Sequence, residues 1–196
     1  MVSTLRPVTG DRDRYADWLV LGLVLIGLAL GWFLRASVLS RTTEFRDPNT
    51  GISVRYPAGW RRSSDTTLLL RVRDPMGGTF PTTLELRVRP LAPEADLRLA
   101  LEGLALERSR TAIAYKPLRT DLVEVQGQVA TRRTFTFVYT GDNPYVEQLP
   151  VVVVGADVAL RLDGERVVIA TLLAEADRFD AEQGRLRAFL ESLRQL

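Results

Sequence analysis

The sequence predicts an α+β fold in which helices flank an antiparallel β-sheet, preceded by a single transmembrane helix. Three observations support this prediction. One uncharged apolar run, residues 18–34, lies near the N-terminus. After it, stretches of alternating apolar and polar residues recur between turns rich in Gly, Pro and Asp. Only the segments 93–106 and 180–196 show helical apolar spacing, so we expect two helices to pack on a meander of strands.

The composition limits the classes of function. The chain has 196 residues, which suits one domain with a short appendage. It holds 26 basic and 24 acidic residues, so nucleic acid is not an expected partner. It contains no cysteine and no histidine. Their absence excludes disulfides, thiol nucleophiles, cysteine metal sites and a lipidated cysteine, and it removes the commonest general base and metal ligand.

The N-terminal segment is the clearest feature. We expect a tail (1–17), a transmembrane anchor (18–39) and an α+β domain (42–196). The uncharged run 18–34 is at the lower limit for crossing a hydrocarbon core of about 30 Å at 1.5 Å per residue. After Arg35, whose charge can reach the membrane surface, residues 36–39 continue the apolar stretch.

Aromatic residues lie at both ends of this run, where a membrane interface would place them. We therefore expect Tyr15 and Trp18 at one interface and Trp32 and Arg35 at the other, with the bilayer as a partner. Two alternatives stay open: a buried helix of a water-soluble protein, and a cleaved signal peptide. Three aspartates in the tail, and Arg35 close to any cleavage site, argue against the signal peptide.

The orientation does not follow from charge. Three arginines precede the run and three follow it: Arg6, Arg12, Arg14, and Arg35, Arg41, Arg46. The positive-inside count is therefore tied. A short tail followed by a large domain is the usual form of a signal anchor, so we expect a single-pass protein with the C-terminal domain outside the cytoplasm.

The stretch FRDPNTGISVRYPAGW (45–60) predicts a β-hairpin, because strands at 42–47 and 51–57 flank a Pro-Asn-Thr-Gly turn. Apolar residues alternate with polar ones in the second strand, which indicates one buried face. Pro57 ends that strand because it has no N–H to donate. The Ala-Gly turn that follows directs Trp60 towards the core.

A second pair of strands, 67–73 and 82–89, flanks the turn DPMGGTFP. Four arginines project together from one face, with Glu85 among them: Arg71, Arg73, Arg87 and Arg89. This arginine row is a candidate contact for an anionic surface, a lipid headgroup or a protein partner. A solvated sheet face, or a position under a helix end, is the more frequent meaning of such a row.

The rest of the chain contains two helices and several strands. The first helix begins near Pro93 and has an apolar stripe; Leu99 and Leu106 lie outside the stripe and would line a groove or a second contact layer. The terminal helix begins near Asp180 as its cap, with Gln183 reaching back to it. Strands are expected at 115–125, 129–140, 150–154, 158–162 and 167–173.

The pattern F-x-D-x-x-x-G-I-S-V-x-Y-P-x-G-W at 45–60, with a meander and a closing F-L-x-S-L helix, resembles the PsbP-like domains. The resemblance covers about 42–196. It implies an α/β/α sandwich and a role as a non-catalytic extrinsic subunit, assembly factor or envelope lipoprotein; some members are similar to lipid-binding carriers. The motif residues then specify the fold, with Phe45 and Trp60 in the core. This chain departs from the lipoprotein members because it has an anchor in place of a lipidated cysteine.

No motif indicates catalysis. A Ser-Lys dyad is limited to Lys116, the single lysine, and Ser109 lacks the Ser-x-x-Lys spacing. Acids in the turns at 142–143 and 163–165 lack the register of a calcium loop. A pair of carboxylates for glycoside cleavage is not excluded, but nothing singles one out. The glycines of PMGGTFP precede no Walker-type lysine. We therefore expect a protein that is not an enzyme, without cofactor or metal.

Two functions remain as hypotheses. The first is a membrane-anchored, extracytoplasmic accessory or assembly module that binds a membrane protein complex. The alternative is a carrier of lipid or another apolar small ligand, held between the sheet and a helix.

Overall fold

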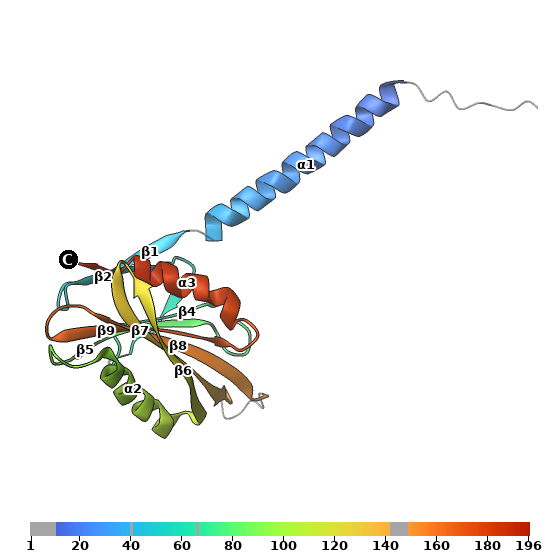
Figure 1. Cartoon of the computed structure of the whole chain (residues 1–196). Helices are drawn as coiled ribbons and strands as arrows, with labels where there is room; N and C mark the ends of the chain where they lie inside the picture. The colour runs from blue at the N-terminus through green and yellow to red at the C-terminus, as the bar shows by residue number, and fades with distance from the viewer. Residues whose placement is uncertain (1–10, 40, 66, 142–148) are drawn as a thin grey trace, which may run out of the picture. The chain divides into compact units, whose positions relative to one another are not determined.

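The computed structural model describes residues 11–39, 41–65, 67–141 and 149–196, apart from the side chains of 11–17 and 34–39. The chain divides into two compact units, Met1–Arg41 and Thr42–Leu196. The described part of the first unit contains the helix α1 (Asp11–Leu39), and the second unit contains the sheets and the other helices (Figure 1).

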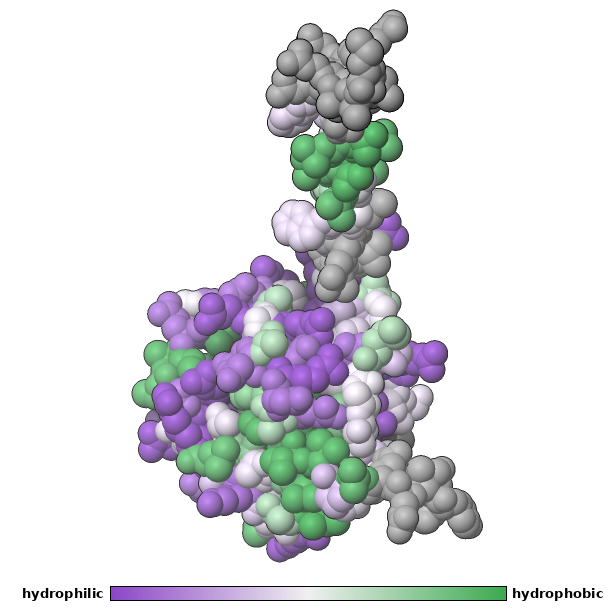
Figure 2. All heavy atoms as spheres, turned by 90° about the vertical axis from the view of Figure 1, so that its right-hand side faces the viewer, coloured by the Kyte–Doolittle hydropathy of each residue, from purple (hydrophilic) through white to green (hydrophobic). Residues whose placement is uncertain are grey.

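Helix α1 holds the apolar run of the sequence. Its described side chains, 18–33, carry no charge, and Figure 2 shows apolar residues of α1 as a green band. Trp18 and Trp32 are exposed, whereas Tyr15 and Arg35 lie outside the described side chains. Among the residues that the structure describes, no helix is both long enough and apolar enough to cross a membrane. The anchor at 18–39 therefore stays a prediction.

The second unit is built on a seven-stranded sheet with the order β3-β4-β5-β9-β8-β7-β6. Every neighbouring pair in it is antiparallel. Its strands are β3 (Arg61–Arg62), β4 (Leu70–Arg73), β5 (Thr83–Pro90), β6 (Ile113–Val125), β7 (Gln128–Tyr139), β8 (Val151–Arg161) and β9 (Arg166–Glu175). Strands β6 to β9 form the predicted meander, so the α+β class is confirmed.

The predicted N-terminal hairpin is also present. Its strands β1 (Thr42–Asp47) and β2 (Ile52–Pro57) pair from Thr42↔Pro57 to Asp47↔Ile52. The Asp47 carboxylate stabilises the turn, because it accepts hydrogen bonds from the Thr50 N–H at 3.1 Å and hydroxyl at 2.6 Å. Gly51 follows with φ +69°, a conformation that favours glycine. The C-terminal strand β10 (Arg194–Gln195) adds to β2 and completes a three-stranded sheet.

The large sheet lies between two helices (Figure 1). Helix α3 (Phe179–Glu191) and the small sheet cover one face, and Trp60 is buried there, as predicted. Helix α2 (Leu97–Thr111) covers the other face and buries Leu101 and Leu104 completely. The predicted sheet between flanking helices is therefore confirmed.

Some predicted boundaries were wrong. The two strands expected at 150–154 and 158–162 form one strand, β8, because the ring of Phe135 on β7 lies against Gly155 and the ladder continues through it. Helix α2 begins at Leu97, since the Asp96 carboxylate caps it by accepting from the Arg98 N–H at 2.9 Å.

The cap of the terminal helix was also misplaced. Asp180 lies inside α3, whose N-cap is Arg178. The side-chain contact between Gln183 and Asp180 is nevertheless present, with the Gln183 amide donating at 2.8 Å. The predicted contact between these two residues was correct, but the predicted position of Asp180 at the N-cap was wrong.

Candidate functional site

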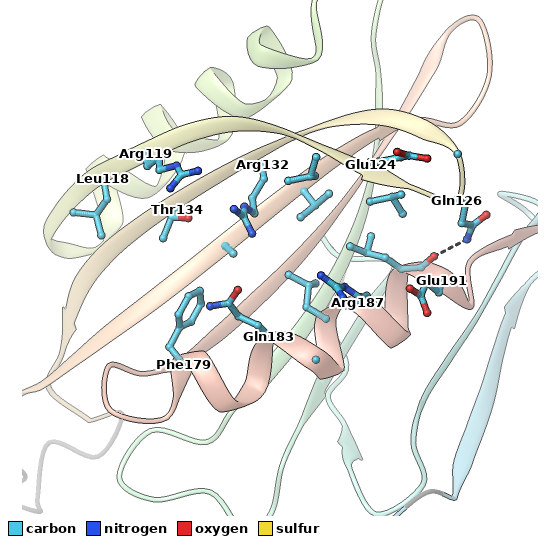
Figure 3. Close-up of a pocket in the computed structure, with 18 residues that line it drawn as sticks. Leu118, Arg119, Glu124, Gln126, Arg132, Thr134, Phe179, Gln183, Arg187 and Glu191 are labelled. Carbon is cyan, nitrogen blue, oxygen red and sulfur yellow. Dashed lines mark hydrogen bonds between the residues drawn. The ribbon is translucent and has the colours of Figure 1, made fainter.

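A cleft of about 880 Å³ opens between α3 and the β6–β7 hairpin. Figure 3 shows the side chains of the hairpin on one side and those of α3 on the other, facing a common space. The volume is within the range of small-molecule sites, about 300–1,000 Å³. The sequence suggested that Leu99 and Leu106 of α2 line a groove or a second contact layer. In the structure these two side chains are 58% and 56% exposed. The cleft is therefore the candidate functional site.

The floor of the cleft is apolar because alternate residues of the strands face α3. These residues and their partners on α3 are Val123, Val125, Ala156, Val158, Phe179, Leu186 and Leu190. Small side chains make the space: Ala156 lies on the floor, and Gly184 of α3 has no atom within 4 Å of where a Cβ would stand. A glycine inside a helix costs about 1 kcal/mol relative to alanine, and no contact within the chain requires one at 184.

A cationic group lies at one end of the cleft. Arg119 on β6 and Arg132 on β7 both pair with Asp121, at 3.2 Å and 2.6 Å. The hydrogen bond from Arg132 and the charges of both arginines hold the pKa of Asp121 below its usual range. Two guanidinium groups share one carboxylate, so the group carries one net positive charge beside an apolar floor.

The opposite end of the cleft is closed by Gln126. It occupies the two-residue turn between β6 and β7 with Gly127, and both have positive φ, +53° and +75°, as a tight hairpin turn requires. The Gln126 amide donates to the carbonyl of Leu190 at 2.7 Å and of Leu193 at 3.0 Å (Figure 3). These bonds tie the hairpin tip to the last turn of α3 and to Leu193, which follows the helix.

The predicted arginine row lies on the other face of the sheet, with α2. Three of its members pair with carboxylates: Arg71 with Asp65 and Glu85, Arg87 with Glu85 and Glu107, and Arg89 with Glu107. Glu107 belongs to α2, so the row lies partly under that helix, which was one of the two simpler interpretations. Its role as a contact for an anionic surface stays a prediction, and three opposing carboxylates weaken the positive field of the row.

The same face contains a buried ion pair that sequence reasoning missed. Asp157 on β8 is 1% exposed; it pairs with Arg108 of α2 and accepts a hydrogen bond from the Thr171 hydroxyl at 2.6 Å. The Arg108 guanidinium also lies 4.3 Å from the ring centroid of Phe135. Burial opposes the charge of Arg108, but Asp157 outweighs it and raises the pKa of the guanidinium. An aspartate between Ala156 and Val158 in an apolar strand was the available signal.

The residues considered for chemistry have structural contacts. The Ser109 hydroxyl donates to the Leu106 carbonyl at 2.9 Å. The Asp163 carboxylate accepts from the N–H groups of Glu165 and Arg166, which is turn chemistry, whereas 142–143 lies outside the described residues.

The structure also bears on two other possible ligand sites, the Gly-rich turn for phosphate and acidic clusters for metal ions. In the Gly-rich turn, Gly78 faces the carboxylate of Glu175, an unfavourable setting for phosphate. Within the described part of the chain, no three Asp or Glu side chains lie together as metal ligands.

Comparison with solved structures identifies the fold. Cyanobacterial PsbP (CyanoP) from Synechocystis sp. PCC 6803 superposes with a TM-score of 0.55 at 14% identity, over 79% of this chain and 92% of that protein. The domain has a PsbP-like fold. LpqN, involved in cell envelope biogenesis of Mycobacterium tuberculosis, gives 0.51 at 15% identity over 78% of this chain and 89% of that one. No protein-family model and no curated protein sequence matches the chain. At these identities the likeness establishes the fold of the PsbP-like domain alone.

Proposed function

We propose that this chain is a non-catalytic, membrane-tethered module that serves an extracytoplasmic membrane protein complex as an accessory or assembly component. The observation that carries the proposal is that a helix containing an uncharged apolar run, residues 18–34, precedes a domain with a PsbP-like fold in the sequence. The absence of histidine and cysteine from the sequence supports a binding role over a catalytic one. The cell-envelope role of the structural neighbour LpqN supports an extracytoplasmic location.

The tether is assigned to residues 18–39 of α1. In a helix, residues 18–39 span about 33 Å at 1.5 Å per residue, close to a hydrocarbon core of about 30 Å. The described side chains 18–33 include Trp18 and Trp32 near their two ends, the positions of an interfacial aromatic belt. The leucines between them are exposed, and lipid around this helix would cover their apolar surface.

The tether is tested by placing charge at its centre. Leu25→Arg with Leu28→Arg adds two arginines, each costing roughly 2.5–3.5 kcal/mol at a helix centre. We expect the full-length wild type to stay in the membrane pellet after alkaline carbonate washing, and this variant to be released. The matched control is Leu99→Arg with Leu106→Arg, two leucines of α2 with similar exposure. Release of the wild type, or equal behaviour of both variants, would contradict the tether.

The orientation is tested by single-cysteine labelling, which is clean because the chain has no cysteine. Thr111→Cys places one thiol at an exposed position at the end of α2. A membrane-impermeant maleimide applied to intact cells should label it. Labelling only after lysis would place the domain on the cytoplasmic side.

The cleft favours a second candidate function, binding of an apolar small ligand. An apolar floor with a few polar groups at its ends is the usual chemistry of such sites. Native mass spectrometry of the full-length protein, released from lipid nanodiscs, should then show a bound species of small mass. A protein that carries no such species, even after exposure to membrane lipid extract, would exclude the candidate.

A further inference from the structure

We propose that the cleft between α3 and the β6–β7 hairpin takes a single-chain anionic amphiphile, with its carboxylate or phosphate at Arg119 and Arg132 and its chain on the apolar floor. The inference rests on the second candidate function and specifies its ligand. Three features of the cleft support it: its charges, its empty volume and its closed end.

The charges favour an anionic head at one end. Arg119 is 70% exposed in its side chain and Arg132 is 31% exposed, so each keeps donors available beside their shared partner Asp121. A guanidinium binds a carboxylate or phosphate with paired, charge-assisted hydrogen bonds. In Figure 3 both arginines and Thr134 lie towards one end of the cleft.

The other charged groups of the cleft are Arg187, Glu124 and Glu191. Arg187 adds a third cation from α3, and all three of these side chains are exposed. The two glutamates lie with Gln126 at the closed end (Figure 3). On the side of Gln126 two carboxylates outnumber one cation, Arg187, whereas at the other end two cations outnumber Asp121 (Figure 3). An anionic head is therefore favoured beside Arg119 and Arg132.

The empty volume fits an apolar chain. The floor runs from Phe179 and Ala156 at the arginine end to Leu190 and Val125 at the end closed by Gln126. Gly184 leaves the α3 wall open although the helix itself gains nothing from a glycine there. Gly103 in α2 is a similar helical glycine outside the cleft, so it provides a matched control rather than a second site.

The experiment uses full-length protein in nanodiscs of neutral phosphatidylcholine. The probes have a ten-carbon chain with a diazirine at its end and a carboxylate, a phosphate or a hydroxyl as head; empty nanodiscs are the blank. After irradiation, labelled peptides are located by mass spectrometry, and competition with decanoate gives relative affinity. The variants are Arg119→Gln, Arg132→Gln and Gly184→Leu, with Arg98→Gln and Gly103→Leu as controls on α2.

We expect saturable labelling of peptides from β6, β7 and α3, with anionic probes binding at least tenfold tighter than the alcohol. Each arginine variant should lower anionic affinity about tenfold and leave the alcohol unchanged, and Arg119 is exposed enough that its loss does not threaten folding. Gly184→Leu should abolish labelling by every probe, and both controls should bind as the wild type does. Affinity should rise about fourfold for each added methylene until the chain fills the cleft.

Two results would overturn the inference, and they are distinguishable. Equal binding of alcohol and anionic probes would refute the anionic head and leave the apolar-ligand function standing. Absence of labelling in the cleft, or labelling unaffected by Gly184→Leu, would refute both. A preference for the carboxylate over the phosphate would indicate a fatty acid, and the reverse would indicate a lysophospholipid-like head.

Discussion

At the scale of the residue, Asp157 explains how the sheet holds a charge within an apolar strand. Its carboxylate is satisfied from both sides, by Arg108 of α2 and by the Thr171 hydroxyl on β9. Breaking a buried pair by removing one partner leaves an uncompensated charge, which is costlier than removing both. Because a buried ion pair adds little net stability, we expect this pair mainly to specify how α2 packs on the sheet.

Asp157→Asn should lower the free energy of unfolding by about 3 kcal/mol, because Arg108 would stay charged and mostly buried. Urea denaturation of the full-length protein measures this. The double variant Arg108→Met with Asp157→Asn should cost clearly less than the sum of the single changes. Glu94→Gln removes the same charge at an exposed position and should change stability by less than about 0.5 kcal/mol. Strict additivity of the two single changes would contradict the pairing.

Gly155 is the other residue whose surroundings dictate its identity. A Cβ at this position would lie 2.2 Å from Cζ of Phe135 and 2.9 Å from Cδ2 of Leu173. Phe135 is fully buried, so its ring cannot move aside without disturbing the core.

Gly155→Ala should therefore destabilise the protein by about 1–3 kcal/mol, the usual cost of overpacking. Thermal unfolding followed by circular dichroism would show the loss as a lower midpoint. Gly164→Ala is the control, because nothing lies within 4 Å of where its added methyl group would stand and its backbone needs no positive φ. An unchanged midpoint for Gly155→Ala would mean that the Phe135 ring can move aside without a cost in stability.

At the scale of the element, local patterns in the sequence predicted the hairpin, α2 and α3, because periodicity and turn residues are local properties. Strand β8 was not predicted as one strand, because a glycine at 155 suggests a strand end in the sequence. Its reason is visible only in the structure, where Phe135 on the neighbouring strand lies opposite Gly155. The cleft was not predicted either. It depends on α3 covering only part of its sheet face and on Gln126 contacting Leu190, which is 64 residues away in the chain.

The Gln126 contact leads to a prediction about the hairpin. Gln126→Ala removes two hydrogen bonds to the end of α3 and also places a residue less suited to positive φ at the turn. Amide hydrogen exchange in the β6–β7 tip should become faster, while exchange in β9 at the centre of the sheet stays unchanged. Gln183→Ala, which loses only a contact with Asp180 inside α3, should leave the tip as it is. Unchanged exchange at the tip would show that these bonds do not hold the hairpin.

At the scale of the whole molecule, stability should depend on pH only in acid and strong alkali. Side-chain hydrogen bonds lower the pKa of the following carboxyl groups: Glu44, Asp47, Asp65, Asp121 and Asp163. A carboxyl group with a lowered folded pKa contributes stability above its unfolded pKa of about 4 and loses it as the pH falls through the folded value. No histidine or cysteine titrates near neutrality.

We therefore expect the free energy of unfolding to be nearly constant from about pH 6 to 9 and to fall below about pH 4. Urea denaturation across this range measures it. Asp121→Asn should weaken the acid dependence, because one of the groups with a lowered pKa is then missing. A marked change of stability between about pH 6 and 8 would contradict this expectation.

The central claim is that a PsbP-like domain is tethered to a membrane and works there by binding. The most direct measurement is extraction of the full-length protein from its native membrane with a styrene–maleic acid polymer after mild crosslinking, followed by mass spectrometry of everything that remains attached. We expect a membrane-bound chain crosslinked in fixed stoichiometry to a membrane protein, or carrying an amphiphile in its cleft. A chain recovered from the aqueous fraction, alone and without ligand, would contradict it.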